Sequence, residues 1–203
     1  MRRLGIWAAL GAIGVVVPAA AQDGLDVSGT SRLRYEAVDG QARTGFNEAD
    51  DLVNLRTTLL AEYREGPVRL TAELWDSRVY GGNERTPITT ADVNPLELVQ
   101  AFVEIAPKAP FGSGSSGSLQ LGRFLLNLGS RRLVAADDYR NTTNGYTGAR
   151  LDLGFRGGWK ATAIYVLPQQ RRPDDPDRLR RNVVVGDHEG TDLVLWGGLV
   201  SRR

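Results

Sequence analysis

Charged side chains recur at every second position within short segments of this chain. The first such segment, residues 25–39, places Arg32, Arg34 and Glu36 at alternate positions. Guanidinium groups stay charged and present forked donors that match carboxylates, so arginines on one face can bind a solute that carries carboxylates. Acidic side chains between them would pair with the arginines and keep that binding weak enough for release. The chemistry that this pattern favours is therefore reversible binding of anions.

The same spacing returns in three further segments. The residues that share one parity are Arg56, Glu62 and Arg64 in 51–64, Arg69, Thr71 and Glu73 in 67–79, and Arg150 and Asp152 in 147–156. A simpler interpretation is that these charges are solvated and pair with one another, which is the commoner fate of any single charged residue in such a ladder. Both interpretations require the charged side chains to share one surface.

Apolar and polar residues alternate throughout these segments, which identifies the elements that position the charges. Successive side chains of a strand point to opposite faces, so each segment predicts a strand with one apolar and one charged side. No segment of the sequence has the spacing of apolar residues that predicts a helix of any length. We predict an all-β fold with strands near residues 25–39, 51–64, 67–79, 94–105, 118–127, 147–156, 159–167 and 191–200.

The strands and their connections favour an antiparallel transmembrane β-barrel. Strands of about ten residues with an apolar outer side, a charged inner side and aromatic residues near their ends are typical of a barrel wall. The connections at 65–67 and 156–158 read as tight turns, whereas 79–94 and 168–190 are long and polar. This alternation of short turns and long loops is the asymmetry of outer-membrane barrels. The Gly/Ser-rich segment 106–117 stands where another short turn is expected.

The N-terminus predicts export from the cytoplasm. Arg2 and Arg3 precede an apolar stretch, residues 4–17, and alanines at 19–21 provide a small-residue cleavage site. We therefore expect a signal peptide over residues 1–21, a β-barrel domain over residues 22–203, and a location in the cell outer membrane. The apolar stretch is short for a spanning helix of about twenty residues.

Composition excludes several classes of protein. The chain has no Cys, so it has neither a disulfide framework nor thiol ligands. Without Arg2 and Arg3 it carries 23 basic and 24 acidic residues, a balance that argues against nucleic acid as a partner. The only histidine, His188, lies in a polar segment with no second histidine for a zinc pair. We expect no catalytic residue, no enzyme activity, no metal site and no cofactor.

One acidic cluster has the side chains of a metal site. Asp174, Asp175 and Asp177 carry carboxylates that suit Ca²⁺, but five arginines crowd the same segment and would compete for them. We therefore do not expect calcium there.

Several segments resemble the alginate export family, whose members are outer-membrane barrels that pass an anionic polysaccharide. The closest stretch is Leu119–Thr142, which contains Gly122-Arg123, Gly129, Arg132-Leu133 and Tyr139 in the family's order. The segments 73–78, 99–103 and 32–36 are similar to the family as well. The resemblance covers nearly all of the chain beyond the expected signal peptide.

The resemblance implies an arginine-lined pore for an alginate-like polysaccharide or small anionic solutes, with outer-membrane lipid and periplasmic export proteins as further partners. It places Arg123 in the pore constriction. Strict alternation would put Arg123 on the apolar side with Leu119 and Leu121, so we expect a bulge at Gly122 to turn it inward. The expected pore-lining residues are Arg123, Arg34, Arg56, Arg32, Arg150, Arg132, Glu62 and Glu73.

Two alternatives remain open at this point. The resemblance implies barrels of about eighteen strands, whereas the sequence predicts about eight. We therefore expect the chain to be an incomplete, N-terminal fragment of a larger barrel. The alternative is a complete small barrel. The chain also ends without the closing aromatic residue that such barrels usually carry. A different class, a periplasmic or secreted β-sandwich that binds or degrades polysaccharide, would show the same alternation but bury its apolar faces in a core.

Overall fold

The computed structural model describes residues 17–22, 24–136 and 139–202, and almost all regular structure in them is β-strand. Residues 1–16 of the expected signal peptide lie outside the described residues, so its cleavage stays a prediction. The strands are β1 (Val17–Gln22), β2 (Leu25–Asp39), β3 (Ala49–Glu65), β4 (Val68–Tyr80), β5 (Asn94–Ile105), β6 (Ser116–Leu125), β7 (Gly145–Gly154), β8 (Trp159–Pro168) and β9 (Leu195–Arg202).

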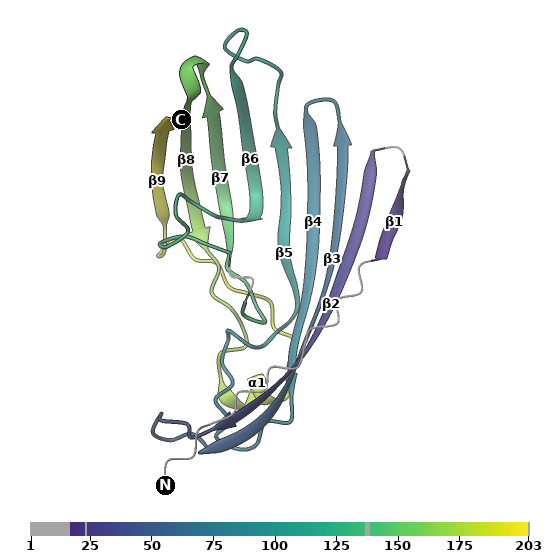
Figure 1. Ribbon diagram of the computed structural model, residues 1–203, viewed down its shortest axis with the longest axis vertical. Helices are drawn as coiled ribbons and strands as arrows, with labels where there is room; N and C mark the ends of the chain where they lie inside the picture. Colours follow the sequence, from purple (N-terminus) through teal and green to yellow (C-terminus); the bar gives the residue numbers. More distant parts are fainter. Residues whose placement is uncertain (1–16, 23, 137–138, 203) are drawn as a thin grey trace.

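The strands form one antiparallel sheet in sequence order, from β1 to β9 (Figure 1). Each expected strand is present with ends within a few residues of the prediction, and β2 matches it at both ends. β1 was not predicted, because all of its residues but Gln22 fall within the expected signal peptide. A single curved sheet of consecutive hairpins confirms the all-β barrel-wall class and leaves the sandwich alternative without the second packed sheet that it needs. The described sheet is open, since β1 and β9 do not pair.

The connections lie alternately at the two ends of the sheet, and those at one end are shorter, as the sequence predicts, except that 106–115 is longer than 40–48. The connections at 66–67, 106–115 and 155–158 lie at one end, which we call the turn end. Residues 40–48, 81–93, 126–144 and 169–194 connect the strands at the other end, the loop end. The last of these contains the short helix α1 (Pro176–Arg180), and Arg156–Gly158 forms a single turn of 3-10 helix, η1. In Figure 1 the strands β2–β4 extend furthest toward the loop end and curve beneath the loops.

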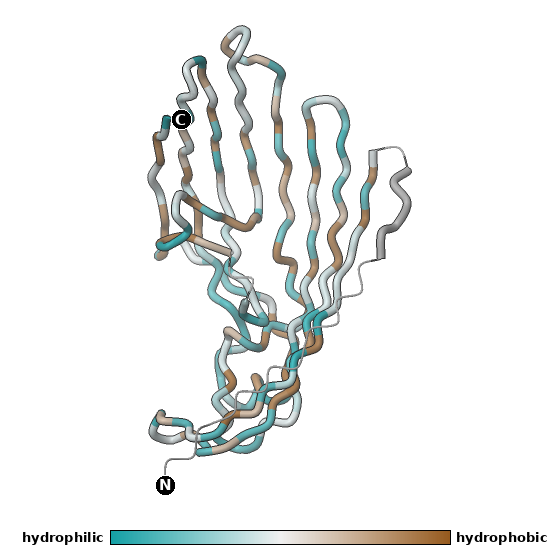
Figure 2. Tube along the Cα trace, viewed as in Figure 1, coloured by the Kyte–Doolittle hydropathy of each residue, from teal (hydrophilic) through white to brown (hydrophobic). Residues whose placement is uncertain are grey.

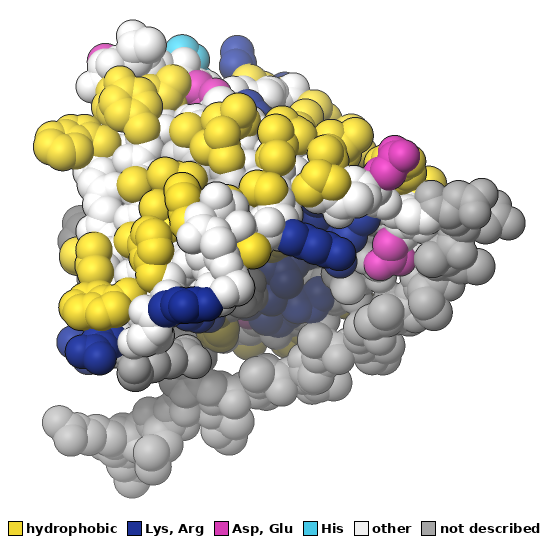
Figure 3. Space-filling view, turned by 90° about the horizontal axis from the view of Figure 1, so that it is seen from above, with side chains coloured by type: hydrophobic (Ala, Val, Ile, Leu, Met, Phe, Trp, Pro, Cys, Tyr) yellow, Lys and Arg dark blue, Asp and Glu magenta, His cyan; other side chains and the backbone are white. Residues whose placement is uncertain are grey.

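The two faces of the sheet differ in chemistry. Hydropathy alternates along most strands (Figure 2), and most of the large side chains on the outer face are apolar and exposed. Viewed from the turn end, hydrophobic side chains lie along the outer side, and Lys and Arg side chains gather in the hollow on the inner side (Figure 3). The exposed apolar residues of the outer face include Leu25, Leu33, Leu59, Leu70, Leu74, Leu98, Ile105, Leu119, Leu121, Leu151, Tyr165, Trp196 and Val200.

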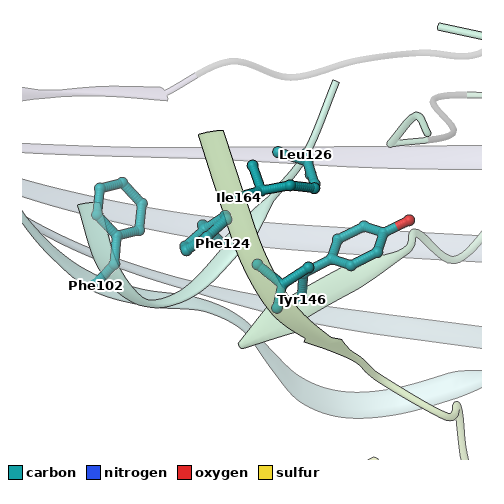
Figure 4. Close-up of a cluster of buried hydrophobic side chains, with 6 residues drawn as sticks. Phe102, Phe124, Leu126, Tyr146 and Ile164 are labelled. Atoms are coloured by element: carbon teal, nitrogen blue, oxygen red, sulfur yellow. The ribbon is translucent and has the colours of Figure 1, made fainter. Parts of the chain in front are cut away.

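Two buried clusters lie on the inner face near the loop end, where loops cover the sheet. The first consists of side chains from β5 to β8 and from the start of the β6–β7 loop, namely Phe102, Phe124, Leu126, Tyr146, Ile164 and Val166; Figure 4 labels the first five. The second joins Leu52 and Val79 of the sheet to Ile88, Val93 and Leu179 of the loops. Burial of these apolar side chains fixes the loops against the inner face.

One loop residue completes the hydrogen bonding of a strand. β4 is longer than its partner β5, and their pairing ends at Ser77 and Asn94. Beyond this point the side chain of Asn182 accepts a hydrogen bond from the Val79 amide and donates one to the Val79 carbonyl, both at 2.9 Å. The buried edge of β4 is therefore satisfied by a side-chain amide.

Among the described residues, no helix has the length and apolar character needed to cross a membrane.

Candidate functional site

The connection between β6 and β7 folds back onto the inner face and contacts three of the predicted arginines. Arg32 donates to the Arg140 carbonyl at 2.7 Å, and Arg56 donates to the same carbonyl at 3.1 Å. Arg34 donates to the Tyr139 carbonyl at 2.9 Å. Because Arg32 and Arg56 are directly opposite each other on β2 and β3, their guanidinium groups converge on one carbonyl oxygen.

Further contacts fix these arginines. Arg34 also pairs with Glu36 at 2.6 Å and lies over the Tyr139 ring, 5.4 Å from its centroid. Arg56 lies over the Trp75 ring of β4 at 4.6 Å. Cation–π contacts of this kind stabilise a guanidinium that has lost part of its water. The three arginines thus line the inner face and hold a loop there.

Asn141 anchors the same loop from the other side. Its side chain is fully buried, and its amide nitrogen lies within hydrogen-bond distance of the carbonyl oxygens of Leu55, Arg78 and Asp92, at 3.1, 3.2 and 2.9 Å. The Ser77 hydroxyl donates to the Asn141 carbonyl at 2.6 Å. Residues 139–143 therefore lie against β3 and β4, across the hollow from the strands that the loop connects.

Arg123 lies at the centre of a second cluster. It donates to Glu97 at 2.6 Å and to the Leu98 carbonyl at 2.8 Å, and it forms a short ion pair with Glu189 of the β8–β9 loop. The Glu97 side chain is only 5% exposed, and the Arg123 side chain 21%. One guanidinium thus bridges β5, β6 and a loop that lies far away in the sequence.

The expected bulge at Gly122 is wrong, although Arg123 does reach the inner side. The pairing of β6 continues without a shift through Gly122 on both neighbouring strands. Arg123 pairs with Ala101, and this is the last pair between β5 and β6; beyond it the Arg123 guanidinium binds Leu98, and Gln100 accepts from the Leu125 amide. The gap between two diverging strands, rather than a change of register, lets the side chain turn inward.

Gly122 is nevertheless required where it is. Its φ is +122°, and a Cβ atom there would lie 2.4 Å from the Ala101 carbonyl oxygen. A larger residue would therefore push β5 away from β6 next to Arg123.

The β8–β9 loop brings two carboxylates with opposite pKa shifts into this cluster. Burial, followed by the nearby Glu97 carboxylate, raises the pKa of Asp187 to about 6, although Asp187 accepts hydrogen bonds from the Arg172 amide and the Asn94 side chain. Burial also acts to raise the pKa of Glu189, but the Thr147 hydroxyl and the Arg123 guanidinium favour its charged form more strongly, and this pKa is lowered. The Asp187 amide donates to Glu97 at 3.0 Å.

The remaining predicted residues pair with neighbours on the strands. Arg150 makes a two-pronged pair with Asp152, at 2.6 and 3.2 Å. Glu62 accepts from Arg64 at 2.9 Å and from Arg69 at 3.1 Å, and Glu73 accepts from Gln100 at 2.6 Å. These contacts lie toward the turn end and in the middle of the sheet.

Other residues that the sequence singled out lie in the loops. Arg132 is exposed on the β6–β7 loop. His188 makes backbone hydrogen bonds to Gln170. Asp174 pairs with Arg172, Asp175 accepts from the Arg178 amide at the start of α1, and Asp177 pairs with Arg180. No group of three metal-binding side chains occurs within the described ranges.

Sequence reasoning missed Glu97, Asn141, Asp187 and Glu189. Glu97 shares the sequence parity of Ala101 and Val103, which lie on the outer face, and a shift of register between β4 and β5 turns it inward, so simple alternation gives the wrong side for it. The other three lie in long polar loops, where alternation gives no information about direction.

An open, twisted antiparallel sheet with exposed apolar residues outside and ion-paired residues inside is the wall of an outer-membrane β-barrel. The comparison with protein families agrees with this class. Residues 23–193 match the model of the family described as Alginate export, and the chain belongs to this family. The family consists of porin-like transport proteins of the outer membrane, and polysaccharide is what its members transport. No curated protein and no solved structure matches the chain.

Proposed function

We propose that the inner face of this sheet lines part of an outer-membrane channel through which an anionic, alginate-like polysaccharide or a related anionic solute passes. The observation that carries the proposal is the convergence of Arg32, Arg34 and Arg56 with residues 139–141 inside the hollow. A loop folded onto the inner face narrows the passage, and arginines at the narrow point reduce the cost of removing water from carboxylates.

The mechanism that follows is passive. Guanidinium groups offer forked donors to carboxylates, and the acidic partners on the same face compete with the solute, so that each contact is brief. A concentration gradient or a periplasmic export protein would supply the direction. Outer-membrane lipid would cover the exposed apolar face, as the expected signal peptide and the family's location require.

Arg123 has a defined part in this proposal. Its charge is balanced by Glu97 and Glu189, so removal of the guanidinium would leave two carboxylates beside the passage. The local potential would become negative and would disfavour anions.

Reversal potentials in planar bilayers under a salt gradient test the proposal. A full-length channel that contains this sheet should give an anion-selective conductance, and Arg123→Ala in that channel should weaken the selectivity. Lys108→Ala removes the same charge from an exposed turn and should leave the reversal potential unchanged. A conductance without anion preference, or an unchanged reversal potential in Arg123→Ala, would contradict the proposal.

A further inference from the structure

The β5–β6 and β7–β8 connections form a concave surface at the turn end. Phe111 and Phe155 stack with their ring centroids 5.9 Å apart, although they are 63% and 42% exposed. Arg156 donates to the Ser113 carbonyl at 2.7 Å and forms a short hydrogen bond to the Ser113 hydroxyl. A cavity of about 530 Å³, open to solvent, is lined by Phe111, Gly112, Ser113, Ser115, Phe155 and Arg156.

This surface faces the apolar side of the sheet. Gly117 pairs with Leu153 and belongs to the same face as the exposed residues Leu119 and Leu151. Pro110 lies against Gly117, because a Cβ atom there would be 3.0 Å from the Pro110 ring. Phe155 continues the parity of Leu151 and Leu153, and Trp159, 45% exposed, follows on the same face. The aromatic pair is therefore continuous with the surface that faces lipid.

The charge around this surface has one sign. Arg156 and Arg202 are exposed at this corner, Lys108 and Lys160 follow on the inner side of the same end, and residues 106–118, 153–161 and 198–202 contain no Asp or Glu. The Arg156 guanidinium contacts only neutral acceptors among the described residues, so it keeps its full positive charge. The Ser113 and Gly114 amides have no acceptor within the described ranges, which leaves hydrogen-bond donors beside Arg156.

We propose that this corner binds the headgroup of an anionic phospholipid, with the phosphate on Arg156 and the neighbouring amides and the acyl chains along Phe111 and Phe155. Guanidinium groups match phosphate oxygens, and basic side chains next to an apolar membrane surface bind anionic headgroups. Aromatic residues prefer the boundary between headgroups and acyl chains. Short turns of outer-membrane barrels lie on the periplasmic side, so the lipid would belong to that leaflet.

A soluble uronate chain is a different ligand that carries anionic groups. The position favours lipid, because the aromatic pair lies on the outer face, and the anion-binding arginines of the proposed passage lie on the inner face. The site depends on the outer-membrane location of the family and not on what passes through the channel.

Native mass spectrometry of the full chain in mixed detergent micelles tests the proposal. The micelles contain equal amounts of phosphatidylglycerol and phosphatidylcholine, and the adducts of each lipid are counted. We expect phosphatidylglycerol to bind in preference, and Arg156→Gln to lower its affinity about fivefold, the effect of one basic residue near an anionic surface. Phe111→Ala should weaken the binding of both lipids, because it removes the apolar half of the site.

Arg64→Gln is the matched control. Arg64 is exposed at the β3–β4 turn of the same end, but it pairs with Glu62, so its loss should leave lipid binding unchanged. Equal adducts of the two lipids, no effect of Arg156→Gln, or equal losses in Arg156→Gln and Arg64→Gln would overturn the proposal. Displacement of phosphatidylglycerol by an oligouronate of matched charge would overturn it as well, because it would identify a saccharide site.

Discussion

The inner face has two halves that contain the same residue types in different surroundings. In the turn half, Glu62, Arg69, Arg150 and Asp152 pair with partners on the same or the adjacent strand, and their side chains stay partly exposed. In the loop half, Arg32, Arg34, Arg56 and Arg123 reach loop residues that lie 66 to 108 positions away in the sequence. Both apolar clusters also lie in the loop half.

This difference separates two uses of the same pattern of charges. Ion pairs in the turn half keep a water-filled surface polar at little gain in stability, because solvent screens them. Arginines in the loop half are partly buried and fix the positions of loops, so each of them carries structure as well as charge. The alternation that places an arginine inside the hollow does not reveal which of these two uses it has.

The largest effect is expected at the centre of the loop half. Arg123→Ala leaves the buried Glu97 carboxylate without its cation and should lower the free energy of unfolding by about 3 kcal/mol. Denaturant unfolding in detergent micelles, followed by tryptophan fluorescence, measures the change. A decrease in the free energy of unfolding below about 1 kcal/mol is typical of an exposed ion pair. Such a result would show that Arg123 contributes no more to stability than the ion pairs of the turn half.

A smaller loss is expected from the loop anchor. Asn141→Ala removes the donor to three buried carbonyl oxygens and should cost about 2 kcal/mol. Asn141→Asp keeps the size but sets a carboxylate against the same carbonyls, so it should be less stable than the alanine variant. The same unfolding measurement compares them, and an Asn141→Asp variant more stable than Asn141→Ala would show that lost packing, rather than hydrogen bonding, accounts for the effect.

The pH dependence of stability distinguishes the halves further. The raised pKa of Asp187 means that its contribution to stability is fully present below its ordinary value of 3.8 and is lost as the pH rises through about 6. The free energy of unfolding should therefore fall by on the order of 1 kcal/mol between pH 5 and pH 7, after allowance for solvent screening.

Asp187→Asn should remove this dependence and keep the stability of the low-pH form. Glu189 acts with the opposite sign, but its contribution is lost only as the pH falls below its ordinary value of 4.5. Unfolding free energies between about pH 5 and pH 7 thus report on Asp187 alone of this pair. The expectation fails if the variant and the parent chain show the same slope.

The smallest effect is expected in the turn half. Arg150→Ala breaks a pair whose side chains are 25% and 36% exposed, and should cost less than about 1 kcal/mol. The difference between this variant and Arg123→Ala is the direct measure of how far the two halves diverge. A loss as large as that of Arg123→Ala would remove the distinction between them.

Local alternation was enough to predict the strands and the face on which most charges lie. Arg32, Arg56 and Arg150 lie on the inner face because their parity is a property of neighbouring residues. The contacts of Arg32 and Arg56 with Arg140, and that of Arg123 with Glu189, were not predictable, since Arg140 and Glu189 come from polar loops with no periodicity. Arg123 is the instructive case, because its direction depends on where two strands separate, and no local pattern records that point.

The side-chain amide of Asn182 has a consequence for assembly. A strand that extends past its neighbour presents bare peptide groups, and such an edge invites pairing with a foreign chain. The carboxamide imitates a peptide unit and occupies both groups of Val79, so the protruding end of β4 offers no template there. The Asn182 side chain thereby removes two peptide groups at which a foreign chain could pair with this part of β4.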